Sequence, residues 1–201
     1  MESIGFYLNR EAELLRNVIS PVWMTWQVPP TVIYGRHQVL EQEINIPYCQ
    51  AQNITIFQRQ SGGGAVYADE GNIMISYISP SPHAQEVFHT FIQKVAAALR
   101  ILGYEVVTTE HNDILVNGCK VSGAACYSNE HGTIAHCTML YDTDLAKMEK
   151  ALTPSQEKLQ RHAVESVRQR VTNLRTILDQ GDVSDFKKRL DEYVIKCETL
   201  V

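Results

Sequence analysis

Three consecutive glycines, Gly62–Gly64, separate two apolar, strand-like segments, and this feature constrains the fold more than any other. The segment 54–57 precedes the glycines and the segment 73–78 follows them. Glycine loses more backbone freedom on folding than any other residue, and a hairpin turn needs positive φ at only one or two residues. A third glycine therefore favours a loop whose backbone N–H groups approach an anion, with the charge of Arg59 beside them. A plain flexible turn is the alternative.

Composition and charge narrow the class of protein. The chain has 201 residues, enough for a domain with a core, and its net charge of −5 argues against a nucleic-acid binder that works by bulk electrostatics. No apolar run reaches membrane-spanning length, and the N-terminus lacks the pattern of a signal peptide. The five cysteines form no C-x-x-C pair, so we expect neither a zinc site nor a disulfide framework. These observations predict a soluble cytoplasmic protein with no nucleic-acid or membrane partner.

The spacing of apolar residues predicts both helices and strands. A helix is expected to open at Asn9, with Glu11 in its first turn, and Gly103 is placed to end another. The remaining helices are expected over 83–102, 144–152 and 184–200. Strands are expected over 22–26 and 31–35, around the turn Pro29-Pro30, and over 54–57, 73–78, 104–108, 113–116, 119–127 and 133–141.

These elements together predict an α+β domain built on a mostly antiparallel or mixed β-sheet flanked by helices, which we place on one side of the sheet. The segment 41–52 is expected to be a loop with a short helix, and the segment 164–174 is semi-regular. No linker divides the chain, so residues 1–201 are expected to form a single domain.

A hairpin with the turn Asn117-Gly118 carries the second candidate site. Lys120 lies on its second strand, followed by small residues, and two interpretations are open: a solvated lysine on an edge strand, or a lysine aimed at a carboxylate or phosphate. The pair Asn112-Asp113 precedes the hairpin. It is either a turn pair or, through the Asp113 carboxylate, part of a site for a divalent metal that carries nucleotide phosphates.

Two cysteines, Cys119 and Cys137, are candidate nucleophiles, and strand geometry bears on both. Neighbours along a strand point to opposite faces, so Cys119 is expected to face away from a ligand at Lys120, and Cys137 away from His136. A catalytic cysteine–histidine pair needs contact between its members, so neither cysteine is expected to be catalytic. A lone histidine in a strand, such as His136, is more often packed and hydrogen-bonded than a base.

The sequence resembles the lipoate–protein ligase catalytic domain, within the wider biotin/lipoate ligase fold. Five blocks carry the resemblance, in the family's order: Thr31–Arg36, Arg59–Asn72, Asn112–Ala125, His136–Thr138 and Ser166–Leu174.

The resemblance implies an ATP-dependent reaction in two steps and no permanent cofactor. Lipoate (or octanoate) attacks the α-phosphate of ATP, with Mg²⁺ as the accompanying ion, and gives an acyl-adenylate and pyrophosphate. A lysine amine of an acceptor then attacks the acyl carbonyl, and AMP leaves. The acceptors implied are lipoyl domains of 2-oxoacid dehydrogenase E2 subunits or the glycine cleavage H protein.

The resemblance also implies roles for individual residues. Lys120 corresponds to the family's essential lysine, whose charge would offset those of the carboxylate and phosphate. The adenylate would be held by Arg59, the backbone around Gly64, Ala65, Val66 and Tyr67, and Asn112 with Asp113, the latter near the magnesium. The acyl group would be held by Ser61, Gly62, Gly63, Lys120, Gly123, His136 and Thr138.

The sequence departs from the family's pattern at several positions. Gln58 stands where the family usually has a first arginine, and Ala68 where a histidine is common. Cys119 replaces a basic residue and Cys137 a glycine. Many ligases carry a small accessory domain after the catalytic domain, and we expect none within the 201 residues. A separate polypeptide could supply it, or the chain could carry out only the transfer step.

Two other functions are kept as alternatives. An octanoyl- or lipoyl-transferase would form a thioester on cysteine and use no ATP, but none of the five cysteines lies where that nucleophile is expected. A degenerate member would bind lipoate or a lipoyl domain without turnover, in keeping with Gln58 and Ala68. A biotin ligase is disfavoured, because the matched blocks are those of the lipoate branch.

Overall fold

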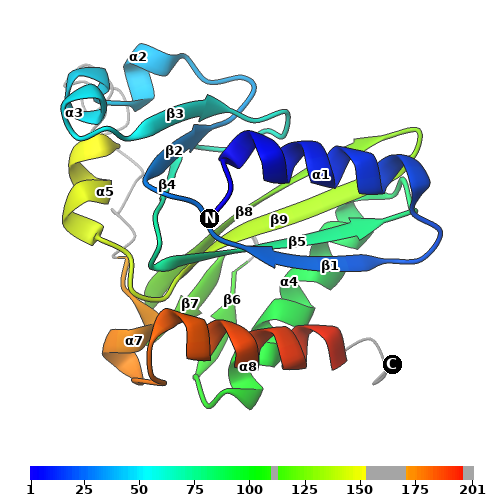
Figure 1. Cartoon of the computed structure of the whole chain (residues 1–201). Helices are drawn as coiled ribbons and strands as arrows, with labels where there is room; N and C mark the ends of the chain where they lie inside the picture. Colours follow the sequence, from blue (N-terminus) through cyan, green and yellow to red (C-terminus); the bar gives the residue numbers. More distant parts are fainter. Residues whose placement is uncertain (110–112, 153–170, 197–201) are drawn as a thin grey trace.

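The computed structural model describes residues 1–109, 113–152 and 171–196, and its largest element is a six-stranded antiparallel sheet (Figure 1). Every neighbouring pair in this sheet is antiparallel. In spatial order the strands are β1 (Val22–Trp26), β5 (Asn72–Ser79), β9 (Gly132–Leu140), β8 (Cys119–Asn129), β7 (Ile114–Val116) and β6 (Val106–Thr108). The α+β class expected from the sequence is confirmed.

A second, three-stranded sheet is smaller and mixed. Its central strand β2 (Thr31–Tyr34) pairs in parallel with β3 (Thr55–Gln58) and antiparallel with β4 (Val66–Ala68). The strands β3 and β5, which flank the three glycines in the predicted pattern, lie in different sheets, and so do β1 and β2. The glycine loop therefore does not close a hairpin between the two predicted strands. It connects β3 to β4, a three-residue strand that the apolar pattern did not indicate.

Helices cover both faces of the large sheet, so the expectation that they lie on one side is wrong. The helices α4 (Ala84–Ile101) and α8 (Val183–Lys196) cover one face, while α1 (Ile4–Asn17) and the small sheet cover the other (Figure 1). The physical reason is the composition of β5 and β9, which are buried along their whole length and need cover on both faces. Four short helices complete the described chain: α2 (Leu40–Glu43), α3 (Ile46–Ala51), α5 (Leu145–Ala151) and α7 (Leu174–Ile177).

Several expected boundaries hold, and one does not. Gly103 follows α4 with φ +95°, and the side chain of Asp144 caps α5 by accepting from the Lys147 N–H, as expected. The helix α1 begins at Ile4 with Ser3 as its N-cap, not at Asn9. The ends of two predicted segments, 164–170 and 197–200, lie outside the described residues. Within the described ranges, no helix has both the length and the apolar character that a membrane span requires.

Candidate active site

Arg59 holds the glycine loop in shape. The residue directly follows β3 and is only 7% exposed. Its Nε donates to Ser61 Oγ at 2.9 Å, and its Nη1 donates to the Ile33 carbonyl at 3.0 Å. Its Nη2 donates to the carbonyls of Gly62 and Gly64, each at 2.7 Å. Four of the five guanidinium donors are thus used within the protein, and direct contact of Arg59 with an adenylate stays a prediction.

The charge of Arg59 is buried without a partner carboxylate among the described residues. None of the ion pairs formed there includes this side chain. Burial lowers the pKa of Arg59 from 12.5 to about 10, so the guanidinium remains charged at neutral pH. A buried cation that lacks a counter-ion favours a bound anion, and the field at the loop therefore suits an anionic ligand.

The three glycines play different parts in the loop. Gly63 has φ +88°, and a Cβ there would lie 3.0 Å from Arg59 Nη2. The Gly63 carbonyl also lies against Gly35, where a Cβ would meet it at 2.2 Å. In contrast, nothing lies within 4 Å of a Cβ built at Gly62 or Gly64. The loop therefore has a fixed centre, with open space beside two of its glycines.

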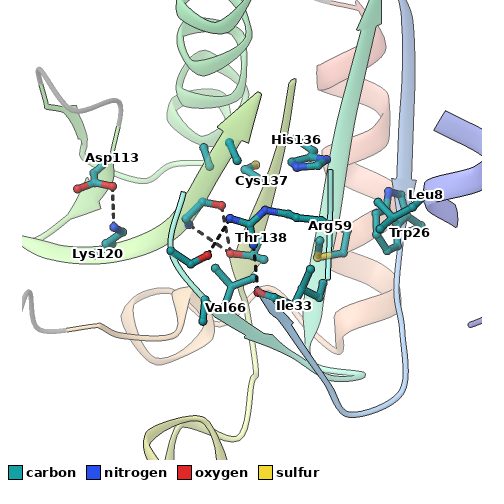
Figure 2. Close-up of a pocket in the computed structure, with 16 residues that line it drawn as sticks. Leu8, Trp26, Ile33, Arg59, Val66, Asp113, Lys120, His136, Cys137 and Thr138 are labelled. Atoms are coloured by element: carbon teal, nitrogen blue, oxygen red, sulfur yellow. Dashed lines mark hydrogen bonds and ion pairs between the residues drawn. The ribbon is translucent and has the colours of Figure 1, made fainter. Parts of the chain in front are cut away.

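A cavity of about 160 Å³ lies between the glycine loop and the strands β5, β8 and β9 (Figure 2). Most of the predicted site residues line it, namely Arg59, Gly64, Ala65, Val66, Asp113, Lys120, Gly123, His136 and Thr138. Apolar residues from four elements add to the wall: Leu8 (α1), Trp26 (β1), Ile33 (β2) and Met74 (β5). The glycine loop and the Lys120 hairpin thus border the same cavity, although more than 50 residues of chain separate Gly64 from Lys120.

The remaining predicted residues lie elsewhere. Ser61 borders a second cavity of about 440 Å³, which shares Leu8, Arg59 and His136 with the first. The Tyr67 side chain is buried in a separate apolar cluster, so Tyr67 could contact a ligand only through its backbone. Gly62 and Gly63 are not part of the first cavity's wall, and Asn112 lies outside the described residues.

One end of the first cavity carries an ion pair. Lys120 Nζ lies 2.7 Å from Asp113 Oδ1, and the two side chains are 28% and 15% exposed (Figure 2). Lys120 pairs with Leu115 of β7 on one side and forms a bridge to Val171 on the other, so it does not lie at a free sheet edge, and this rules out the first interpretation of the lysine. Both backbones are held in place. The Asp113 N–H donates to Thr109 Oγ1 at 3.1 Å, and the Lys120 carbonyl accepts from the Thr172 N–H at 3.1 Å.

A buried hydrogen-bond network lies beside Arg59. His136 Nε2 is 2.9 Å from Ser61 Oγ, and His136 Nδ1 is 3.3 Å from Glu11 Oε2. The other Glu11 oxygen accepts from the Ser76 hydroxyl at 2.5 Å. The tautomer that completes the network has Arg59 donating to Ser61, Ser61 donating to Nε2, and Nδ1–H donating to Glu11. His136 is thus packed and hydrogen-bonded, as expected of a lone strand histidine.

The predicted site did not include Glu11, which is only 2% exposed. A helix that began at Asn9 would have Glu11 in its first turn. The helix dipole stabilises an acidic side chain there, so the position of Glu11 would need no other explanation. Because α1 begins at Ile4, Glu11 lies in its second half and faces the sheet. The signal was an acidic residue within the stripe Ile4, Leu8, Glu11, Leu15, whose other members are apolar and helically spaced.

Comparison with known proteins assigns the chain to a family. Residues 4–195 match the family profile described as the lipoyl protein ligase A/B catalytic domain. The chain belongs to this family. Lipoate–protein ligase 1 of Staphylococcus aureus is 35% identical over 161 residues, which are 79% of this chain and 49% of that protein. Lipoate-protein ligase LplJ of Bacillus subtilis is 34% identical over 167 residues, 82% of this chain and 50% of that protein. The chain spans about half the length of these two relatives.

Solved structures of lipoate–protein ligases share the fold. The bi-partite lipoate protein ligase of Thermoplasma acidophilum, described with its E2 lipoyl domain, has a TM-score of 0.81 and 28% identity, and the match covers 96% of this chain and 78% of that one. A lipoate-protein ligase A bound with ATP has a TM-score of 0.80 and 26% identity, with 96% and 79% covered.

Three departures from the lipoyl ligase pattern, at Gln58, Ala68 and Cys119, lie outside the wall of the first cavity, whereas Cys137 is one of the residues that line it. The Gln58 side chain is exposed and donates to the Arg36 carbonyl at 3.4 Å, and Ala68 is buried in a cluster with Ile4 and Trp26. The Cys137 side chain packs into the core on the α4 side, where burial raises the pKa of its thiol to about 12. His136 faces the other way, so the expected separation of the two side chains is confirmed, and Cys137 stays a thiol at neutral pH.

Proposed function

We propose that this chain is the catalytic part of an ATP-dependent lipoate–protein ligase, which activates lipoate (or octanoate) to an acyl-adenylate and transfers the acyl group to a lysine of an acceptor. The observation that carries the proposal is the cavity itself. Its wall combines apolar side chains such as Leu8 and Met74, a charged end at Lys120, and the glycine loop with the buried charge of Arg59. An acyl chain with a carboxylate head needs this combination of apolar and cationic groups.

In the first step a carboxylate oxygen forms a bond to the α-phosphorus of ATP, and the bond from that phosphorus to the bridging oxygen of pyrophosphate breaks. Both reactants are anionic and repel each other. The ammonium group of Lys120 would lower that repulsion, and its position on the cavity wall supports this role. The buried charge of Arg59 and the open side of the loop at Gly64 suit the adenylate phosphate.

In the second step the neutral amine of the acceptor lysine attacks the acyl carbonyl, the bond to AMP breaks, and the amine loses a proton. Here Lys120 would stabilise the charge that develops on the departing phosphate. The apolar wall would hold the acyl chain in place between the two steps, and would also limit the access of water to the reactive mixed anhydride.

We also propose that Asp113 takes part in binding Mg²⁺ together with nucleotide phosphates. In the described part of the chain, no group of three or more histidine, cysteine or acidic side chains is arranged for a metal. Mg²⁺ commonly binds through one or two carboxylates plus substrate phosphates, and Asp113 is a partly exposed carboxylate on the cavity wall. When bound, the ion would neutralise phosphate charge.

The proposed acceptors are lipoyl domains of 2-oxoacid dehydrogenase E2 subunits or the glycine cleavage H protein. The archaeal relative described with its E2 lipoyl domain supports the first of these. That relative is also described as bi-partite, which supports a second polypeptide that assists this chain in adenylation. The proposed location is the cytoplasm, where ATP is available. The cysteines of the described residues are free thiols, which suits that reducing compartment.

The test is an adenylation assay on the purified chain with lipoate, Mg²⁺ and ATP, followed by addition of an apo lipoyl domain. We expect lipoyl-AMP, pyrophosphate and then a lipoylated acceptor. Transfer from an octanoyl carrier protein without ATP would instead identify a transferase. Binding of lipoate with no adenylate, even after addition of a candidate accessory polypeptide, would identify a binding protein without turnover.

A further inference from the structure

The two charged groups at the end of the cavity neutralise each other. Lys120 and Asp113 form an ion pair at 2.7 Å, yet the proposed function gives each a different partner: the substrate carboxylate for Lys120 and the metal-bound nucleotide for Asp113. A carboxylate that reaches Lys120 would also come close to the Asp113 carboxylate, and like charges repel strongly at a partly buried site. The ion pair therefore competes with the ligand.

The other cation in the described part of the cavity wall, Arg59, has a single N–H donor left for a carboxylate. Arg59 uses four of its five N–H donors on Ser61 and on three backbone carbonyls. Asp113 is likewise the only carboxylate among the described residues of that wall. Backbone bonds hold both chain segments, as shown above for Thr109 and Thr172, so the pair is part of the folded architecture rather than a chance surface contact.

We propose that Asp113 acts as an internal substitute for the substrate carboxylate on Lys120, so that acyl acid and metal-bound nucleotide bind with positive cooperativity by separating this pair. The inference rests on the proposed ligase function. The first ligand must separate the pair, whereas the second finds its partner already released. Thermodynamic linkage requires the effect to be reciprocal, and couplings of this kind commonly change affinity by a factor of about 5–150.

The first measurement is the affinity of lipoate for the full chain without nucleotide and with EDTA present, by isothermal titration calorimetry. We expect Asp113→Asn to bind lipoate roughly 10-fold more tightly than the wild type, because Lys120 is released. Neutral lipoamide should bind both proteins alike. In the wild type, Mg²⁺ with a non-hydrolysable ATP analogue should raise lipoate affinity by a similar factor.

A matched control comes from a second lysine–aspartate pair. Lys187 and Asp191 lie 2.9 Å apart on α8, with side chains 25% and 31% exposed, on the face of the large sheet away from the cavity. Asp191→Asn should leave lipoate affinity unchanged. Thermal unfolding of each variant establishes that it is folded, and Asp113→Ala provides a second variant if the asparagine variant is unstable.

A double-mutant cycle with Lys120→Met separates the proposal from simple repulsion. If Asp113 acts by occupying Lys120, Asp113→Asn changes lipoate affinity in the wild type but not in the Lys120→Met background. Ligand-detected NMR measures the weaker lipoate affinities expected in the Lys120→Met background. An equal gain in both backgrounds would show that Asp113 acts by repulsion alone and would overturn the inference. Unchanged affinity in Asp113→Asn, or no effect of the nucleotide analogue in the wild type, would overturn it too. These three results leave the ligase proposal standing, whereas absence of lipoate binding in every protein would overturn both.

Discussion

At the scale of single residues, Lys120 and Arg59 have different tasks, although the charge pattern of the sequence suggests the same task, anion binding, for both. Arg59 is tied to the glycine loop by four hydrogen bonds, whereas the Nζ of Lys120 contacts the exchangeable partner Asp113. An arginine suits the first task because its planar fork meets several carbonyls at once, and a lysine suits the second because its charge is compact. We infer that Lys120 stabilises the reacting charges and Arg59 prepares the surface beside them.

We expect Lys120→Ala to lower the rate of adenylate formation by about 100- to 1,000-fold, the usual cost of removing one group that stabilises transition-state charge. Pyrophosphate release in the presence of lipoate and ATP measures this rate. Lys187→Ala removes a lysine from the comparable pair on α8 and should keep the wild-type rate. A Lys120→Ala rate close to that of the wild type, in a folded protein, would contradict the mechanism.

Glu11 allows a prediction about stability. Its carboxylate accepts from Ser76 and lies within hydrogen-bond reach of His136, and the residue is buried. Glu11→Ala should lower the free energy of unfolding by about 3 kcal/mol, because two buried donors lose their acceptor at about 1–3 kcal/mol each. Urea unfolding measures the change. Glu13→Ala on the same helix removes an exposed carboxylate and should cost less than about 0.5 kcal/mol, so equal losses in the two variants would refute the role of burial.

At the scale of elements, the glycine loop shows what a sequence can and cannot predict. The triple glycine and its arginine argued against a plain hairpin turn between the flanking strands, and the topology confirms this part, whereas the approach of the loop to an anion stays a prediction. The three-residue strand β4 could not be predicted from the sequence, because so short a segment shows no periodicity of apolar residues. The start of α1 was placed too late, since Asn9 is a good cap residue and local preference cannot tell which cap the tertiary structure uses.

The three glycines should respond differently to substitution. Gly63→Ala should destabilise the fold by about 1–2 kcal/mol, the cost of a left-handed conformation for an L-residue, with crowding at Arg59 added. Gly62→Ala should be nearly neutral for stability, because its Cβ would meet nothing. Chemical unfolding measures both. Similar losses in the two variants would mean that the loop's fixed centre is not at Gly63.

At the scale of the whole molecule, the site exists because two sheets meet. Local patterns indicated that the glycine loop and the Lys120 hairpin are both unusual, but contact between them depends on the packing of the small sheet over β8 and β9, which sequence spacing does not specify. Family resemblance supplied that link. The same limit explains Glu11: its partners Ser76 and His136 come from two other strands, more than 60 residues away. Helix cover on both faces was within reach of the sequence: the nearly unbroken apolar run over 73–78 is typical of a strand buried on both faces, whereas a strand covered on one face alternates apolar and polar residues.

A ligand that contacts both the glycine loop and strand β8 should therefore stabilise the two together. We expect a hydrolysis-resistant lipoyl-adenylate analogue, at about 100 times its dissociation constant, to stabilise the protein by about 2.7 kcal/mol. Amide hydrogen exchange should slow both in the loop around Gly64 and in β8 around Gly123, because each contributes wall to the same cavity. Amides of α8, on the far face of the large sheet, report only global stabilisation and serve as the internal reference. Protection of the loop without protection of β8 would mean that the ligand occupies one half alone, and that the cavity between the sheets is not the site of the adenylate.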